Sequence, residues 1–243
     1  LVGTVGASLF LLGIGFAYIA TGTLNMGDLA AQLAEVGYDS PLVLAAFGLL
    51  VVGLFVKIAV FPLHTWQPAA YAGAPDSVSA FISALVSTVA AYALIRIVFT
   101  VFGTEFLAAT PLASTVLAAG AVVSIVVGSL LAVSQSELKR MLAYSSVSQF
   151  GLIVGAVAVG NVVALTGAAI HLVGHAIMKG GLFLTVGLVD DATGARTVDE
   201  YAGLAKQSPV GAAAFSVLAV AMVGIPPAVG FVGKWYIAYG AVQ

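Results

Sequence analysis

Seven long apolar stretches are the feature that most limits how this chain can fold. A helix needs about 20 predominantly apolar residues to cross the roughly 30 Å hydrocarbon layer of a membrane. Because the stretches are continuous and do not alternate between polar and apolar residues, they predict transmembrane helices and not barrel strands. The predicted crossings are 1–20, 43–61, 78–102, 112–133, 143–160, 163–189 and 209–229, followed by an apolar tail from Phe231 with the length of half a helix.

The composition excludes several classes of function. Only 7% of the residues are charged and the formal net charge is −2, too small to hold nucleic acid by releasing counterions. The chain has no cysteine, so thiolate zinc sites and cysteine-bound iron–sulfur clusters cannot form within it. Neither a nucleotide-binding loop nor a nucleophile–base–acid triad is found, so the sequence predicts no cofactor and no catalytic site of its own. The start at Leu1, with no preceding basic run, leads us to expect a piece of a longer protein.

The basic residues between the crossings predict how the chain is oriented. Lys and Arg are retained preferentially on the cytoplasmic side of a membrane. Lys139 and Arg140 fall in the loop after the fourth crossing, and Arg196 and Lys206 fall in the loop after the sixth, whereas the opposite side has only Arg96. The sequence therefore predicts a multi-pass protein of the plasma membrane whose chain start is cytoplasmic.

Proline interrupts two of the predicted crossings, at Pro62 and at Pro226-Pro227. Proline removes a backbone donor and frees carbonyl groups, which a membrane tolerates only where protein or a wet cavity satisfies them. Paired broken helices in two halves of a chain are typical of transporters built from inverted repeats. A plain kink, with the prolines acting as hinges, is the alternative at either site.

Three ionisable residues lie near these breaks. Lys57 is well inside the second crossing, where an unpaired charge costs at least about 2.5–3.5 kcal/mol. A lysine held between burial and a nearby carboxylate can load and release a proton. Lys234 follows the second break and is interpreted in the same way, with an interfacial anchor as the alternative. His64 directly follows the first break, where a proton-relay role and a hinge role are both open.

The sixth crossing contains His171, His175 and Lys179, each four residues apart. This spacing places them on one face of a helix over about 12 Å. Histidine titrates near neutral pH, so the three side chains predict a line of proton carriers. No metal site is predicted, because the helix offers no nearby carboxylate and the lysine would repel a cation. A pair of structural histidines stays open as the alternative.

Four segments carry a resemblance to a known family. They are KIAVFPLHTWQPAAYAGAPDSVSA at 57–80, LKRMLAYSSVSQFG at 138–151, HLVGHAIMKGGLF at 171–183 and GIPPAVGFVGKW at 224–235. Together they resemble the proton-translocating antiporter-like family. That family comprises the large membrane-arm subunits of respiratory complex I (NADH:quinone oxidoreductase), related subunits of membrane-bound hydrogenases, and the A and D subunits of Mrp-type Na⁺/H⁺ antiporters.

The resemblance implies a single membrane domain over 1–243, a middle piece of a roughly fourteen-helix inverted-repeat subunit. Residues 1–102 would be the end of the first repeat and 112–243 most of the second. It also implies that Lys57 pairs with a glutamate on an earlier helix that is absent here. Where several members have a further lysine this chain has Thr88, and Lys234 replaces the glutamate of some complex I members.

The sequence thus predicts a membrane subunit that conducts protons through buried Lys and His residues. Transport would be coupled to Na⁺ exchange, as in Mrp-type antiport, or to quinone reduction in a complex I-like assembly. The predicted partners are the other membrane subunits of such an assembly, the lipid bilayer, protons and, in the antiport case, Na⁺. Two alternatives are a quinone-binding redox subunit and a structural scaffold whose lysines merely bond to carbonyl groups.

Overall fold

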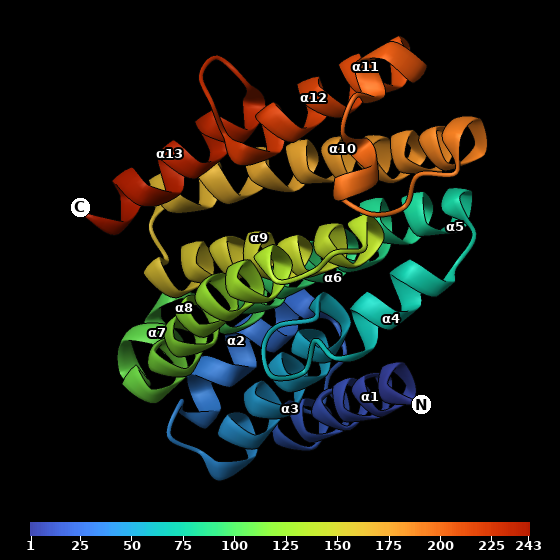
Figure 1. Ribbon diagram of the computed structural model, residues 1–243. Helices are drawn as coiled ribbons and strands as arrows, with labels where there is room; N and C mark the ends of the chain where they lie inside the picture. Colours follow the sequence, from blue (N-terminus) through green and yellow to red (C-terminus); the bar gives the residue numbers. More distant parts are fainter.

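The computed structural model describes residues 1–243 as an all-helical protein without strands (Figure 1). Six helical segments are long and apolar enough to cross a membrane, which confirms the prediction of an all-α integral membrane fold at this level. They are α1 (Val2–Thr21), α3 (Pro41–Ile58), the continuous segment Asp76–Ala109, α8 (Pro111–Val133), α9 (Leu138–Val159) and α10 (Val162–Thr193).

The segment Asp76–Ala109 contains two π-helical turns. It consists of α5 (Asp76–Phe81), the turn Ile82–Val86, α6 (Ser87–Arg96), the turn Ile97–Phe102 and α7 (Gly103–Ala109). A π-helical turn widens the helix locally and is frequent at functional sites. The first of the two turns packs against α10, which contains the predicted line of proton carriers.

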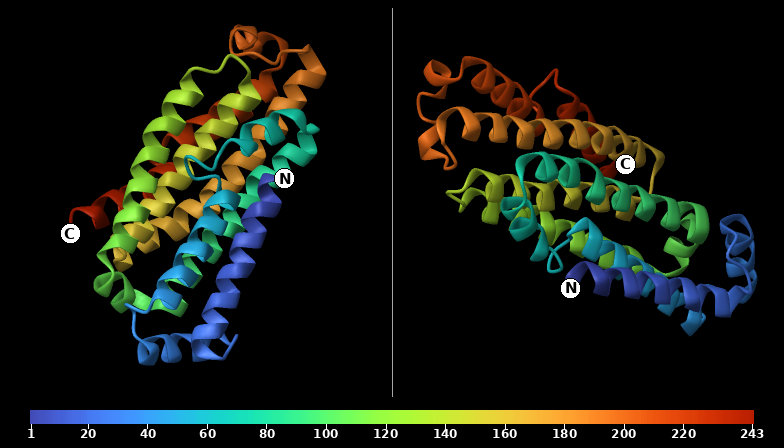
Figure 2. Two further views of the ribbon diagram at one scale, coloured as in Figure 1. Left: turned by 90° about the horizontal axis from the view of Figure 1, so that it is seen from below. Right: turned by 90° about the vertical axis from the view of Figure 1, so that its right-hand side faces the viewer.

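The remaining helices are shorter. They are α2 (Met26–Val36), α4 (Trp66–Gly73), α11 (Leu204–Gln207), α12 (Pro209–Val223) and α13 (Val229–Ala241). α2 was not predicted from the sequence, and it lies across the ends of α1 and α3 (Figure 2). The side chain of Asn25 caps this helix by accepting from the backbone N–H groups of Gly27 and Asp28.

Some predicted boundaries were wrong. α3 ends at Ile58 and not at residue 61, because the chain turns away before Pro62. Lys139 and Arg140 belong to the first turn of α9 and not to a loop, where Arg140 pairs with Glu137 at 2.9 Å. The seventh predicted crossing gives α12, whose 15 residues are fewer than the about 20 that one straight crossing needs.

The helices form three layers (Figures 1 and 2). α1 and α3 make one outer layer, α6, α8 and α9 the middle, and α10, α12 and α13 the other outer layer. Small residues allow neighbouring backbones to approach closely, as is usual between membrane helices. A Cβ atom at Gly53 of α3 would lie 2.7 Å from the backbone nitrogen of Phe10 in α1, and one at Gly128 of α8 would lie 2.7 Å from that of Ser148 in α9.

α12 and α13 lie one after the other along α10, antiparallel to it (Figure 1). Gly211 at the start of α12 is close to Val189 near the end of α10. At the other end, Gly240 in α13 is close to Ala164. The two short helices are therefore the two halves of one broken path that runs beside most of α10.

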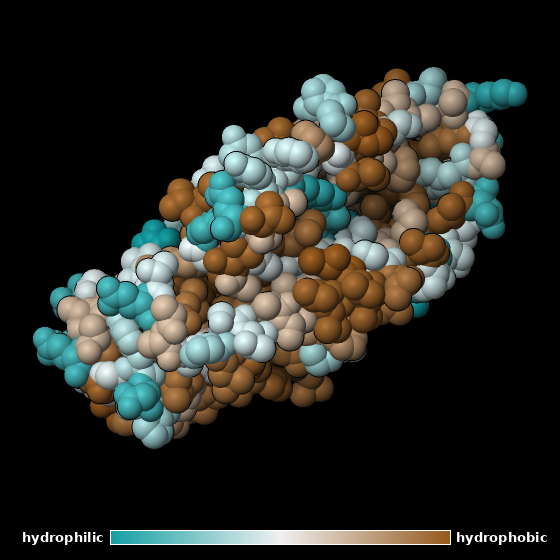
Figure 3. Space-filling view, turned by 90° about the vertical axis from the view of Figure 1, so that its left-hand side faces the viewer, coloured by the Kyte–Doolittle hydropathy of each residue, from teal (hydrophilic) through white to brown (hydrophobic).

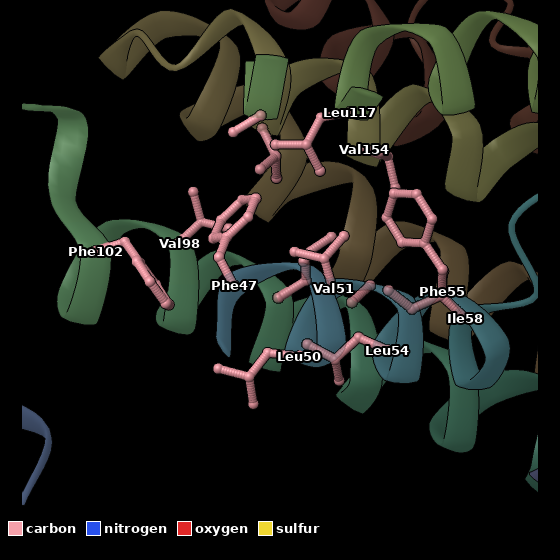
Figure 4. Packing of buried hydrophobic residues seen from close by; sticks show 14 of the residues in the cluster. Phe47, Leu50, Val51, Leu54, Phe55, Ile58, Val98, Phe102, Leu117 and Val154 are labelled. Atoms are coloured by element: carbon pink, nitrogen blue, oxygen red, sulfur yellow. The ribbon is translucent and has the colours of Figure 1, made fainter. Parts of the chain in front are cut away.

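Apolar side chains fill the interior and also cover much of the outside. Phe47, Val51 and Phe55 of α3 point toward Leu117 of α8 and Val154 of α9 in the largest buried cluster (Figure 4). Brown, apolar residues cover much of the face in Figure 3, and hydrophilic residues lie at its two ends and in smaller groups between them. This distribution is expected of a protein surrounded by lipid around its middle.

Candidate functional site

The three predicted proton carriers of α10 lie inside the protein. His171, His175 and Lys179 are all fully buried, and the two imidazole ring centroids are 6.3 Å apart. Phe150 of α9 packs against the ring of His175 at a centroid distance of 4.5 Å. None of the four ring nitrogens has a hydrogen-bond partner in the protein. Buried polar atoms nearly always have a protein or water partner, so these nitrogens have free capacity to bond water.

Lys179 bonds to the first turns of α9. Its Nζ donates to the backbone oxygen of Leu142 at 2.5 Å and to the hydroxyl oxygen of Ser145. The same Leu142 oxygen also accepts from the Ser145 hydroxyl at 2.9 Å. The contact of Ser145 was not predicted, because a serine in a membrane helix ordinarily bonds to its own backbone, and its position in the sequence does not reveal a partner on another helix.

The first break separates α3 from α4. The backbone N–H of Phe61 donates to the hydroxyl oxygen of Ser124 in the middle of α8, at 2.9 Å. The indole Nε1–H of Trp66 donates to the backbone oxygen of Val56 at 2.7 Å. Protein groups therefore satisfy part of the backbone that the break around Pro62 frees, as membrane depth requires.

Lys57 and His64 do not join the α10 line directly. Lys57 is exposed and lines an apolar groove of about 780 Å³ between α1 and the segment from α5 to α6, where its amine has no protein partner. His64 is buried in the break, stacked on Phe61 at 5.2 Å and 6.0 Å from the ring of Tyr144, next to Ser145 in sequence. Its Nδ1 has no partner, which fits either of its predicted roles.

A buried polar cluster lies between the first break and α10. Gln67 of α4 donates to the hydroxyl oxygens of Tyr71 at 3.0 Å and Ser87 at 3.3 Å, and Tyr71 packs edge-on against Phe183 of α10. The Ser87 hydroxyl donates to the backbone oxygen of Lys57 at 3.4 Å. This cluster was not predicted from the sequence, because its three members come from two helices and carry no charge.

The second break places Lys234 across the gap between α12 and α13. Its Nζ donates to the backbone oxygens of Met222 at 2.8 Å and Val223 at 3.1 Å, which are terminal carbonyls of α12 without helical partners. Gly233 allows the close approach of α13, because a Cβ atom there would lie 2.9 Å from the Cβ atom of His171. The break therefore brings Lys234 to the His171 end of the α10 line.

Charged residues gather where α5 and α9 begin and α10 ends. Lys139 pairs with Asp76 at 2.5 Å, and Arg196 pairs with Asp190 at 2.9 Å. The segment after α10 folds back over this end, where the backbone N–H of Leu138 donates to the oxygen of Arg196 at 3.0 Å. A small polar cavity of about 70 Å³ lies here, and its charged lining residues are Glu137, Lys139, Asp190 and Arg196.

The carboxylate of Glu200 stabilises the segment that folds back. It accepts from the backbone N–H groups of Arg196 and Thr197 at 2.8 and 2.9 Å, and these bonds lower the pKa of the carboxyl group below its usual value. Their stabilisation is therefore complete above the unfolded-state pKa and is lost as the pH falls through the lower folded-state pKa. We expect the amide hydrogens of Arg196 and Thr197 to be protected from hydrogen exchange at pH 7. Their protection factor, which is the intrinsic exchange rate divided by the observed rate, should be smaller at pH 3.

The Glu200→Gln variant is the control for this expectation. Its amide side chain keeps one acceptor oxygen but cannot ionise, so protection at Arg196 and Thr197 should be weaker at pH 7 and should not depend on protonation of residue 200. Equal protection in the two proteins at pH 7 would contradict the assignment.

Comparison with known proteins places the chain in a family. Residues 1–243 match the family described as NADH:quinone oxidoreductase/Mrp antiporter, TM. The chain is 46% identical to NADH-quinone oxidoreductase subunit N of Desulforudis audaxviator, over 100% of this chain and 48% of the relative. It is 37% identical to the D subunit of the Na(+)/H(+) antiporter of Bacillus subtilis, over 97% of this chain and 47% of the relative.

The structural comparison gives the same result. A chain of the membrane-bound sulfane sulfur reductase, an archaeal respiratory membrane complex, superposes with a TM-score of 0.90 and 32% identity, over 100% of this chain and 49% of that one. The chain thus spans about half the length of the relatives it matches. The match over its full length, the membrane helices and the resemblance of its four motifs agree, and the chain belongs to the NADH:quinone oxidoreductase/Mrp antiporter transmembrane family.

Proposed function

We propose that this chain conducts protons within a membrane assembly, along an axis of amines and imidazoles whose central members are buried. The axis consists of Lys57, the line His171, His175 and Lys179, and Lys234. The observation that carries the proposal is the fully buried line on α10, with four ring nitrogens that have no protein partner. Water molecules bonded to these nitrogens would connect neighbouring titratable groups, and each protonation would alter the proton affinity of the next group through charge repulsion.

Lys179 is suited to the centre of this axis. Removing an ammonium from water costs several kcal/mol or more, and Lys179 bonds only to one carbonyl and one hydroxyl, with no carboxylate among its partners. Because no carboxylate holds this amine in an ion pair, it can pass a proton to a neighbouring group without breaking one. The polar cluster of Gln67, Tyr71 and Ser87 would extend the path from Lys179 toward the first break.

The arrangement of the helices supports the predicted topology. We propose that α12 and α13 together form the seventh crossing, with residues 1–102 and 112–243 belonging to two inverted repeats. Each half contains a broken helix with a lysine beside the break, a pattern typical of secondary transporters. The basic residues Lys139, Arg140, Arg196 and Lys206 gather at one end, which supports a cytoplasmic location of that end and of the chain start in the plasma membrane.

The family supports a role in a larger assembly. Its relatives are named as subunits of NADH-quinone oxidoreductase and of an Na(+)/H(+) antiporter, and a structural neighbour belongs to a respiratory membrane complex. We propose that this chain likewise assembles with other membrane subunits. Proton movement along its axis would then be coupled either to quinone reduction or to the counter-movement of Na⁺.

A structural scaffold is the second candidate, and specific contacts favour it. Lys179 and Lys234 both donate to backbone carbonyl oxygens, as a scaffold role predicts. The two candidates differ in what happens when an amine is removed. A scaffold would lose stability but not selectively lose proton transport, whereas a proton path would lose transport in a protein that still folds.

Lys57 offers the clearest test between them, because its amine has no structural contact to lose. The Lys57→Met variant should assemble normally, and the coupled pumping of the full-length protein in its complete assembly should fall at least about tenfold, equivalent to about 1.4 kcal/mol on the rate-limiting barrier. The measurement is proton uptake into sealed vesicles. Unchanged pumping in this variant would count decisively against the proposal.

A further inference from the structure

The face of α10 that holds the proton line continues beyond Lys179 to the charged end of the protein. Leu182, Val186 and Asp190 follow Lys179 at steps of three or four residues, so they share its face. Asp190 lies about 16 Å from Lys179 along the helix axis, at about 1.5 Å per residue. This face therefore has a titratable side chain at each end of the interval, Lys179 and Asp190, and apolar side chains between them.

The small polar cavity lies at the outer end of this interval. Its lining comprises Ala72, Glu137, Lys139, Val186, Asp190 and Arg196. Its volume of about 70 Å³ is sufficient for several water molecules, because one water needs at least about 10–15 Å³ of such space. The charged and titratable groups around it are Asp76, Glu137, Lys139, Arg140, Asp190, Arg196, Glu200 and Tyr201.

Two apolar layers separate the cavity from Lys179. α9 and α10 are antiparallel, and the contact between Ser145 and Lys179 sets their register. This register brings Leu142 of α9 to the level of Leu182, and Leu138 to the level of Val186. All four side chains are buried and belong to one apolar cluster. Val186 also lines the cavity, so the outer layer, formed by Leu138 and Val186, separates the cavity from the interior.

We infer that the cavity is the aqueous mouth of the proton line, and that the layers Leu138–Val186 and Leu142–Leu182 form a hydrophobic gate between the mouth and Lys179. Apolar constrictions of this kind conduct only when water enters them. The carboxylate of Asp190, which is paired with Arg196, lines the cavity on one side of the gate, and the amine of Lys179 lies on the other. Protons cross when water transiently bridges the two layers. This inference rests on the proposed role of Lys179 in proton conduction.

Cysteine labelling tests the mouth, because no native cysteine occurs among these residues. The Val186→Cys variant of the full-length chain, in its complete assembly in sealed vesicles, is treated with a charged, membrane-impermeant methanethiosulfonate reagent. The matched control is Leu188→Cys, whose side chain is 52% exposed on the apolar outside of the same helix. We expect Val186→Cys to react at least about tenfold faster, from one side only, because a thiol next to water ionises and a thiol in lipid does not. Equal or slower reaction at Val186→Cys would overturn the assignment of the mouth.

A second pair of variants tests the gate. Val186→Ser should hydrate the outer layer and raise the passive proton leak of the vesicles several-fold, whereas Val186→Leu should keep it at the native level. A leak in Val186→Ser equal to that of the native protein would overturn the gate. Neither readout depends on coupled pumping. These tests can therefore refute the mouth while the proposed function stands. The proposed function itself would be refuted by normal pumping in the Lys179→Met variant.

Discussion

Replacing Lys179 with Met is expected to abolish coupled proton transport while the protein continues to fold. Met has a similar length and no charge, and replacing a buried charged group with a well-packed apolar one is often neutral or stabilising. The Ser145 hydroxyl keeps its bond to the backbone oxygen of Leu142, so the variant leaves that hydroxyl partnered. Transport should fall at least about tenfold, measured as the initial rate of proton uptake by vesicles containing the complete assembly.

The control for this variant is Lys206→Met. Lys206 is exposed in α11, between α10 and α12, and bonds to nothing through its side chain. Its replacement should leave both the amount of assembled protein and the rate of proton uptake unchanged. A Lys179→Met protein that assembles normally and transports at the rate of the Lys206→Met protein would refute a central role for the α10 line.

Among the glycine-to-alanine substitutions in this chain, Gly230→Ala should disturb the structure most. A Cβ atom at this position in α13 would overlap the backbone oxygen of Ala221 in α12, so the two halves of the broken path would have to separate. Overpacking of this kind typically costs about 1–3 kcal/mol or more. Lys234 would also move away from the oxygens of Met222 and Val223, and proton uptake should fall together with the thermal unfolding temperature of the purified assembly.

Gly15→Ala is the matched control for this packing effect. Gly15 is also a helical glycine, in α1, but no neighbouring atom lies within 4 Å of where its Cβ atom would be. Alanine is favoured over glycine within a helix by about 1 kcal/mol, so this variant should be as stable as the native protein or slightly more stable. If Gly230→Ala unfolded at the same temperature as Gly15→Ala, the tight approach of α12 and α13 would be contradicted.

The sequence was sufficient to predict the membrane class and the face of α10. Apolar length alone identifies helices that can span a membrane, and six of the predicted stretches match such helices. The sequence also predicted that His171, His175 and Lys179 share one face, because residues four apart lie on the same side of any α-helix. The prolines likewise marked both interruptions, and the structure places a break at each of them.

The contacts between helices could not be predicted in the same way. The partner of Lys179 is a serine on another helix, and the partners of Lys234 are carbonyl groups that become available only because α12 ends at Val223. The packing of α13 beside α10 depends on glycines that allow the two helices to approach closely. The polar cluster of Gln67 and Tyr71 depends on how α4 is placed after the break. These features follow from tertiary packing, and contacts between distant segments cannot be inferred from the local patterns of a single sequence.

We propose that protons pass among Lys57, Lys179 and Lys234. The most direct measurement is proton flux into sealed vesicles that contain the complete assembly, with each of the three lysines replaced in turn by Met and with Lys206→Met as reference. We predict that each of the three variants loses at least about nine-tenths of the flux at normal assembly levels, while the reference keeps all of it. Fluxes equal to the reference in all three variants would contradict the account.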